Sequence, residues 1–272
     1  MSMPIPAPRV TARAFLLDGD GVLYRGPTPL PGAAAFIAAL NTTATPYLLL
    51  TNNASRTPQQ LAAEVAAMGI ALDADHIFTS AQATALWLQA HYPHTPRVLL
   101  IGEAGLEQAL QQAGFLLTDD HRAADLVVVG LDRQATYARL AAAALAIGRG
   151  CPFIASNPDR SIPTERGIEP GAGALVALLE ATTGVAPVMI GKPEPAFFHQ
   201  ALARLGMAAA DAVMVGDRYE TDILGGNRAG LRTVAVLTGI SHAAEFAAAD
   251  PPPTWMLADL QALLEAWAGD EV

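Results

Sequence analysis

The sequence has few cysteines, few basic residues and no long apolar run, and each shortage excludes a class of protein. Cys151 is the one cysteine among 272 residues, so the chain cannot form an internal disulfide framework. Lysine and arginine together number 16 against 26 acidic residues, which gives a net charge of −10. Because the binding of DNA or RNA depends on neutralising many phosphates, we expect no nucleic-acid partner.

Neither a membrane span nor a leader peptide is evident in the sequence. No apolar run approaches the ~20 residues that cross a bilayer, and residues 1–13 contain no long apolar region. We therefore expect a cytoplasmic protein without a membrane partner. Hydrophobic residues, by contrast, make up 52% of the chain, which suffices for the core of one large or two modest domains.

Short apolar runs alternate with helical stretches along the chain. Continuous apolar runs, rather than alternating ones, are typical of parallel strands that helices cover on both faces. The expected strands are residues 14–18, 47–51, 98–102, 126–130, 153–156, 188–191, 212–216 and 233–237. Two helices between them have recognisable ends: one begins at Thr57-Pro58 and stops before Gly69, and another stops before Gly114. The alternation predicts an α/β fold with a doubly wound parallel sheet.

Chemically suggestive residues follow strands in the two flanks of the chain but rarely in its middle. Asp18, Thr51, Lys192 and Asp217 each end a strand, and ligands of open parallel sheets bind at the carboxyl ends of the strands. We therefore expect these four strands to share one sheet. The predicted domains are a core of residues 1–81 and 186–272 and an inserted α/β domain of residues 82–185.

Two pairs of aspartates form the first group of candidate functional residues. Asp18 and Asp20 follow an apolar strand between glycines, which permit a sharp turn. Asp217 and, five residues later, Asp222 follow another such strand. The turn lets both carboxylates of the first pair face one point beyond the strand. The second pair are candidate metal ligands, because carboxylate oxygens suit Mg²⁺. Taken alone, the first pair also fits a polar turn and the second an acidic helix N-terminus.

Polar and basic residues after two further strands form the second group. The backbone amides of Asn52 and Asn53, with the side chain of Thr51, are candidates for cradling phosphate oxygens. Lys192 follows an apolar strand, where its charge is placed to neutralise a phosphate or a nucleophile. By itself, the first of these segments also fits an ordinary loop between a strand and a helix.

Together these segments resemble a known enzyme superfamily. DGDGVL, LLLTNN, GKP and GDRYETD, in this order, resemble the four motifs of the haloacid-dehalogenase-like phosphotransferases. The two asparagines after Thr51, the GDRxxTD form of the last motif and the segment 156–175 resemble its NagD-like, para-nitrophenylphosphatase-like subfamily. The resemblance spans nearly the whole chain and implies a Rossmann-like core with an inserted α/β cap domain.

The resemblance also implies a Mg²⁺-dependent phosphatase that forms an aspartyl-phosphate. In it, Asp18 would be the nucleophile and a metal ligand. Asp20 would act as general acid and then general base, with its backbone carbonyl on the metal. Asp217 would bind Mg²⁺ directly, and Asp222 would act through water or by orienting its neighbours.

Phosphate- and substrate-binding residues are implied on both flanks and in the cap. The residues expected to hold phosphoryl oxygens are Thr51, Asn52, Asn53 and Lys192, of which Thr51 and Lys192 count as catalytic. The candidate substrate contacts of the cap are Asn157, Asp159 and Arg160. Asn157-Pro158-Asp159 is equally compatible with a turn that only shapes its loop.

The expected substrate is a small phosphorylated metabolite of the phosphoglycolate, sugar phosphate, nucleoside monophosphate or para-nitrophenyl phosphate type. Vertebrate pyridoxal phosphate phosphatases of the subfamily carry a histidine where this chain has Ile162, which argues against a specialisation for pyridoxal phosphate. The resemblance further implies a homodimer formed through the cap.

Other functions share parts of this pattern. Haloacid dehalogenases lack the second aspartate of the first motif, so Asp20 argues against that activity. A receiver-like, non-catalytic phosphate-binding module is also disfavoured, because a built-in general base shortens the life of a phosphorylated aspartate. A phosphomutase or another phosphotransferase of the superfamily remains open, since sequence alone does not show whether the cap allows a product to rebind.

Overall fold

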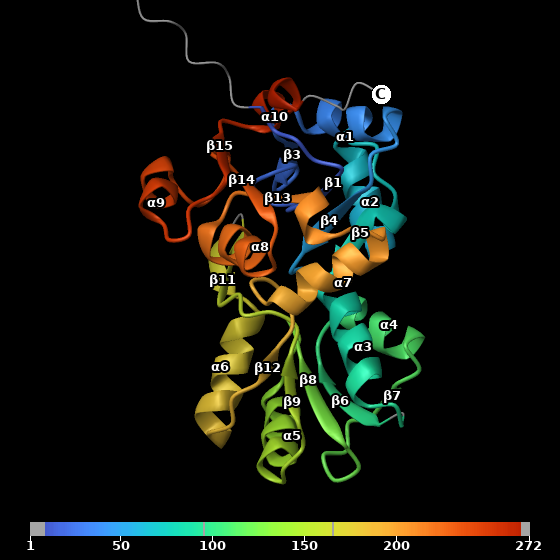
Figure 1. Cartoon of the computed structure of the whole chain (residues 1–272). Coiled ribbons are helices and arrows are strands. Elements are labelled where there is room, and N and C mark those ends of the chain that lie inside the picture. The colour runs from blue at the N-terminus through green and yellow to red at the C-terminus, as the bar shows by residue number, and fades with distance from the viewer. Residues whose placement is uncertain (1–8, 95, 165, 268–272) are drawn as a thin grey trace, which may run out of the picture. The chain divides into compact units, whose positions relative to one another are not determined.

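A computed structural model describes residues 9–94, 96–164 and 166–267 (Figure 1). The chain divides into two compact units, the first made of residues 1–50, 62–76 and 198–272 and the second of residues 51–61 and 77–197. The domain boundaries expected at residues 82 and 185 stay a prediction. Residues 1–8, part of the segment in which we expect no leader peptide, lie outside the described residues.

All of the strands expected from the sequence are present, and their ends differ from the expected ones by at most two residues. They are β1 (Ala14–Leu17), β4 (Tyr47–Thr51), β6 (Arg97–Ile101), β8 (Leu126–Val129), β9 (Phe153–Ala155), β12 (Val188–Met189), β13 (Ala212–Gly216) and β14 (Arg232–Val236). The described helices are α1 (Ala33–Thr42), α2 (Pro58–Ala67), α3 (Ser80–His91), α4 (Ala104–Gln112), α5 (Tyr137–Gly148), α6 (Ala172–Thr183), α7 (Pro195–Leu205), α8 (Leu224–Arg228), α9 (Ala243–Ala248) and α10 (Leu260–Ala266). The predicted α/β class is confirmed.

In the sheet of the first unit, the strands lie next to one another in the order β15-β14-β13-β1-β4, and β15 spans Trp255–Leu257. All of these pairs are parallel. Every residue of β1 and β13 is buried, as their continuous apolar sequences predict. Because β1 and β13 are direct neighbours, with Leu17 opposite Val215, the residues that follow them emerge side by side.

Aromatic rings fill the core of the first unit near the start of β1. The ring of Phe15 meets those of Phe36 and Trp267 edge to face, at centroid distances of 5.2 and 5.3 Å. Such pairs stabilise by about 0.5–1.5 kcal/mol beyond the area they bury. They tie β1 to α1 and to the residue that follows α10, so the strand preceding Asp18 is firmly held.

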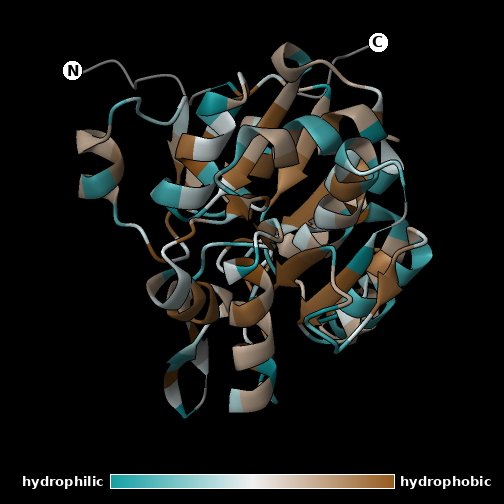
Figure 2. Cartoon of the chain, turned by 90° about the horizontal axis from the view of Figure 1, so that it is seen from below, coloured by the Kyte–Doolittle hydropathy of each residue, from teal (hydrophilic) through white to brown (hydrophobic). Residues whose placement is uncertain are grey.

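The second unit contains its own parallel sheet, in the order β12-β9-β8-β6-β7, with β7 spanning Leu116–Leu117. Helices α5 and α6 pack on its buried strands, with Ala146, Ile147 and Leu179 in the shared core. Figure 2 shows most strands of the central sheets in the brown of hydrophobic residues, whereas most loops are teal or pale.

One expectation about this architecture is wrong. The strand before Lys192 was expected in the same sheet as the strand before Asp18, but β12 pairs with β9 of the second unit, with Val188 opposite Ile154. An apolar run indicates that a strand is buried, but it does not indicate which of the two sheets the strand joins. The choice of neighbour therefore depends on the tertiary structure.

The sequence patterns also missed the short strands. The hairpins β2–β3 (Tyr24–Arg25 and Thr28–Pro29) and β10–β11 (Ser161–Thr164 and Gly167–Pro170) are too short or too exposed to give a periodic signal, and so are β5 (Ile77–Thr79), β7 and β15. The helix start at Thr57 is confirmed, because its hydroxyl accepts the N–H of Gln60 at 3.2 Å. None of the helices in the described residues is long and apolar enough to cross a membrane.

Candidate active site

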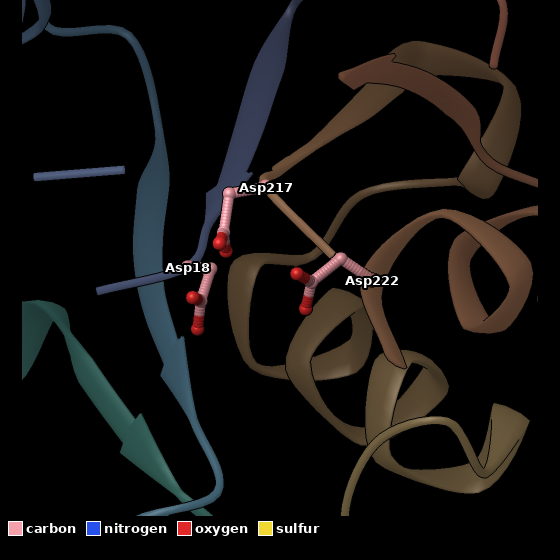
Figure 3. A group of neighbouring side chains, drawn as sticks. All are labelled: Asp18, Asp217 and Asp222. Atoms are coloured by element: carbon pink, nitrogen blue, oxygen red, sulfur yellow. The ribbon is translucent and has the colours of Figure 1, made fainter. Parts of the chain in front are cut away.

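Three carboxylates of the first unit meet beyond the ends of β1 and β13 (Figure 3). Asp18 follows β1 directly, and Asp217 follows β13. Asp222 comes from a π-helical turn, Tyr219–Ile223. One potential ligand atom of each lies within 4.8 Å of the others. Three hard oxygen donors at this spacing fit a small divalent cation such as Mg²⁺, with water completing its shell.

Asp217 and Asp222 are almost fully buried, with 2% and 1% of their surface exposed. Buried carboxylates need hydrogen bonds or a cation. Asp217 accepts the N–H of Ile240 on its Oδ2 at 2.8 Å, and Asp222 accepts the N–H of Arg218 on its Oδ2 at 3.2 Å. Each carboxylate therefore has a defined orientation, which its own turn sets for Asp222 and the segment after β14 sets for Asp217.

The turn after β1 directs Asp18 toward this cluster. The N–H of Asp18 still bonds to the carbonyl of Val215 at 2.9 Å, so the residue is the last to pair with β13. The chain then reverses through Gly19 and Gly21, where the N–H of Leu23 reaches the Gly19 carbonyl at 2.9 Å. Gly21 has φ of +89°, a conformation that favours glycine.

Asp20 lies in the same turn but outside the group of three clustered carboxylates. It is an exposed residue, yet the protein on one side removes enough water to raise the pKa of its carboxyl group above the usual value. The positive charge of Arg25 and hydrogen bonds from the backbone of Gly26 and Gly21 act in the opposite direction. The effect of burial outweighs these, so Asp20 keeps its proton to a higher pH than an ordinary aspartate does.

In the second unit, Asn52 connects two of the segments that the sequence predicted. Its Oδ1 accepts the N–H of Lys192 at 2.8 Å, and its Nδ2 donates to the Lys192 carbonyl at 3.1 Å. The same Nδ2 donates to Oδ2 of Asp159 at 3.1 Å. A Cβ on Gly191 would lie only 2.5 Å from Oδ1 of Asn52, so glycine is required there for this approach.

Lys192 is 3% exposed and is the only lysine in the chain; the other 15 of the 16 lysine and arginine residues are arginines. Burial of a cation at this position is costly without anionic partners. The peptide groups on both sides of its Cα atom are bonded to Asn52, so the backbone position of Lys192 does not depend on its charge.

The other predicted residues divide into those that shape loops and one that is exposed. Asn157, 4% exposed, donates to the Asn52 carbonyl at 2.8 Å and accepts the N–H of Asp159 at 3.1 Å. Asn53 accepts the N–H and the hydroxyl of Ser55 on its Oδ1, and its own N–H donates to Thr51 Oγ1. These contacts organise the loops. Arg160 is exposed.

Two further contacts of these residues were not predicted from the sequence: one is made by Ser80 and the other by residues 238–241. Ser80, fully buried, donates its hydroxyl to the Asn52 carbonyl at 2.8 Å. Residues 238–241 lie against Asp217 in the first unit. A signal for residues 238–241 exists, because a Thr-Gly pair follows the apolar strand β14 after one intervening residue, Leu237.

Comparisons with known proteins agree with this arrangement. Residues 15–116 match the family model described as haloacid dehalogenase-like hydrolase, and residues 189–263 match one described as HAD-hydrolase-like. An acid sugar phosphatase of Staphylococcus saprophyticus is 42% identical over 93% of this chain and 97% of its own length. One of Staphylococcus aureus is 41% identical over 91% and 95%.

Solved structures give the same result. A thermostable NPPase of Geobacillus stearothermophilus is 41% identical and superposes with a TM-score of 0.86, covering 92% of this chain and 97% of its own. NagD of E. coli K-12 is 35% identical, with a TM-score of 0.86 over 92% and 98%. The chain therefore belongs to the haloacid dehalogenase-like hydrolases. Within that family it is a phosphatase of the NagD-like subfamily.

Proposed function

We propose that this phosphatase depends on Mg²⁺ and hydrolyses a small phosphomonoester through an aspartyl-phosphate on Asp18. The observation that carries the proposal is the convergence of Asp18, Asp217 and Asp222, with ligand atoms within 4.8 Å, at the carboxyl ends of two adjacent parallel strands. Bound Mg²⁺ would supply positive charge that offsets the repulsion between a carboxylate and a phosphate dianion.

In the first half-reaction, an oxygen of the Asp18 carboxylate attacks the phosphorus atom and the ester P–O bond breaks. The leaving alkoxide takes a proton from the carboxyl group of Asp20. In the second half-reaction, a water molecule gives a proton back to Asp20 and attacks the phosphorus, and the bond to Asp18 breaks. The products are inorganic phosphate, the carboxylate of Asp18 and the protonated carboxyl group of Asp20. Asp20 thus serves first as an acid and then as a base.

The residues of the second unit would hold the phosphoryl group. Phosphoryl transfer needs in-line positioning and neutralised oxygen charge more than complex covalent chemistry. In this proposal the ammonium of Lys192 and the segment Thr51, Asn52 and Asn53 bind the phosphoryl oxygens. Asn157 and Asp159 hold the loop around Asn52, and Arg160 contacts the leaving group.

Turnover of para-nitrophenyl phosphate with and without metal tests the proposal. After removal of divalent cations by EDTA, we expect the rate to fall at least ~100-fold, because metal charge stabilises the transition state by several kcal/mol. Added Mg²⁺ should restore the rate. Ca²⁺ should not, because it prefers longer bonds and more ligands. An enzyme equally active in EDTA would exclude the metal-dependent mechanism.

For the substrate class, we propose a sugar phosphate. Relatives more than 40% identical over nine-tenths of the chain are named acid sugar phosphatases. In a panel of phosphorylated metabolites, sugar phosphates should show a kcat/KM at least ~10-fold above phosphoglycolate and nucleoside monophosphates, because differences in leaving-group contacts of 1–3 kcal/mol are typical. A preference for phosphoglycolate would overturn this choice.

Three structural expectations belong to the same proposal. Residues 82–185 would act as a cap that selects the leaving group and excludes water, as lids do in other enzymes. Two copies would associate through the cap, and the protein would act in the cytoplasm. Light scattering of the purified chain tests the association, since a monomer at working concentration would exclude the dimer.

A further inference from the structure

Residues 237–241, which follow β14 and are called the clamp loop below, close around the carboxylate of Asp217. The N–H of Ile240 donates to Oδ2 of Asp217 at 2.8 Å, and the N–H of Ser241 donates to its backbone carbonyl at 3.0 Å. One loop thus binds the side chain and the main chain of the same residue. Rotation of the Asp217 carboxylate would break the first bond and leave a buried polar atom without it.

Two glycines flank this carboxylate. A Cβ atom on Gly239 of the clamp loop would lie 1.7 Å from Oδ2 and 2.2 Å from Cγ of Asp217. A Cβ atom on Gly21 would lie 2.4 Å from the same Oδ2. Gly21 has a positive φ, whereas Gly239 does not. The requirement for glycine at position 239 is therefore purely steric: a side chain there would displace the carboxylate.

The clamp loop also contacts the turn that carries Asp18. The hydroxyl of Thr238 donates to the Gly21 carbonyl at 2.6 Å. The guanidinium of Arg25, which lies in β2 shortly after this turn, donates to the Thr238 carbonyl. The same segment therefore bonds to the loop after β1 and to the loop after β13, which supply two of the three clustered carboxylates.

A further contact reaches the turn that carries Asp222. The hydroxyl oxygen of Ser241 accepts the N–H of Tyr219 at 3.1 Å, and the hydroxyl donates to Glu245 at 2.8 Å. Tyr219 is the first residue of the π-helical turn that ends one residue after Asp222. The clamp loop is thus joined by hydrogen bonds to all three segments of the carboxylate cluster.

We propose that the clamp loop is a positioning element of the cation site: it sets the orientation of the Asp217 carboxylate, and through it the affinity for a divalent cation, without contacting the cation. The inference deepens the proposed function, on which it rests. Partners that orient a metal ligand typically contribute ~10- to 100-fold in affinity or activity. Thr238, Gly239 and Ile240 are accordingly positioning residues.

Gly239→Ala tests the steric part of the proposal. Isothermal titration with Mg²⁺, at a temperature where the variant is folded, should show a dissociation constant raised ~10- to 100-fold. The melting temperature without metal should also fall, because the displaced carboxylate loses its hydrogen bond from Ile240. Gly148→Ala is the matched control, because position 148 ends α5 and has open space around it. This control should bind Mg²⁺ as the wild type does. Asp217→Asn should abolish measurable binding.

A second pair of variants tests the hydrogen bond of Thr238. Thr238→Val keeps the shape and removes the hydroxyl, so we expect Mg²⁺ affinity to fall by at least ~5-fold, the equivalent of one lost hydrogen bond. Thr238→Ser keeps a hydroxyl and should restore most of the affinity. At saturating Mg²⁺, kcat of Thr238→Val should return toward the wild-type value, which a general loss of structure would not allow.

The outcomes separate this inference from the function on which it rests. A wild-type chain that fails to bind Mg²⁺ would overturn both. Wild-type binding together with unchanged affinity in Gly239→Ala would overturn the positioning role alone. If Gly239→Ala does not fold, Thr238→Val decides the matter, and wild-type affinity in that variant would contradict the proposal.

Discussion

Asp18→Asn is expected to lower kcat for para-nitrophenyl phosphate by at least ~10⁴-fold, the range seen when a catalytic nucleophile is removed. The amide has the shape of the carboxylate, but it is a far weaker nucleophile and carries no charge for a cation. The rate should be measured at saturating Mg²⁺, so that weaker metal binding does not account for the loss. Asp119→Asn, the same change at an exposed residue, should retain the wild-type rate.

Trapping of the intermediate strengthens this test. In Asp20→Asn the second half-reaction lacks its base, whereas nitrophenolate can leave without a proton in the first. With labelled para-nitrophenyl phosphate, a phosphoryl group should therefore accumulate on the protein and survive acid quenching. The double variant with Asp18→Asn should carry no label. A rate within tenfold of wild type for Asp18→Asn, or label that persists in the double variant, would show that another residue is the nucleophile.

Lys192→Met is expected to lower kcat/KM by about 10²- to 10³-fold, the cost of removing one preorganised charge from a transition state. Methionine keeps an apolar stem of similar length. Because the backbone of Lys192 bonds to Asn52 through both of its neighbouring peptide groups, the loop should keep its shape and the melting temperature should change little. Arg122→Met, which removes an exposed cation, is the control.

Chemical modification checks the same role without mutation. Since Lys192 is the only lysine, an amine-directed reagent can react in this chain only there or at the α-amino group. Loss of activity should follow modification of Lys192, and inorganic phosphate should slow that modification. A Lys192-modified enzyme with full activity would exclude a role of its charge in phosphate binding.

The local structure followed from the sequence because it depends on properties of single segments. The apolar runs at 14–17 and 212–216 are buried strands because every residue in them gains by leaving water. The N-cap at Thr57 depends on residues three positions apart. Motif order was enough to predict the family, and the comparisons confirm it.

Pairing between distant segments was decided only by the tertiary structure. The sequence did not reveal that the strand before Lys192 joins β9, because burial does not specify a neighbour. Nothing in the sequence singled out Gly239, which matters because a Cβ atom at that position would lie 1.7 Å from Oδ2 of Asp217. Thus the sequence by itself determined the strands that carry continuous apolar runs, the family and the candidate residues. The tertiary structure decided which carboxylates meet and what holds them, because such contacts depend on packing across the whole chain.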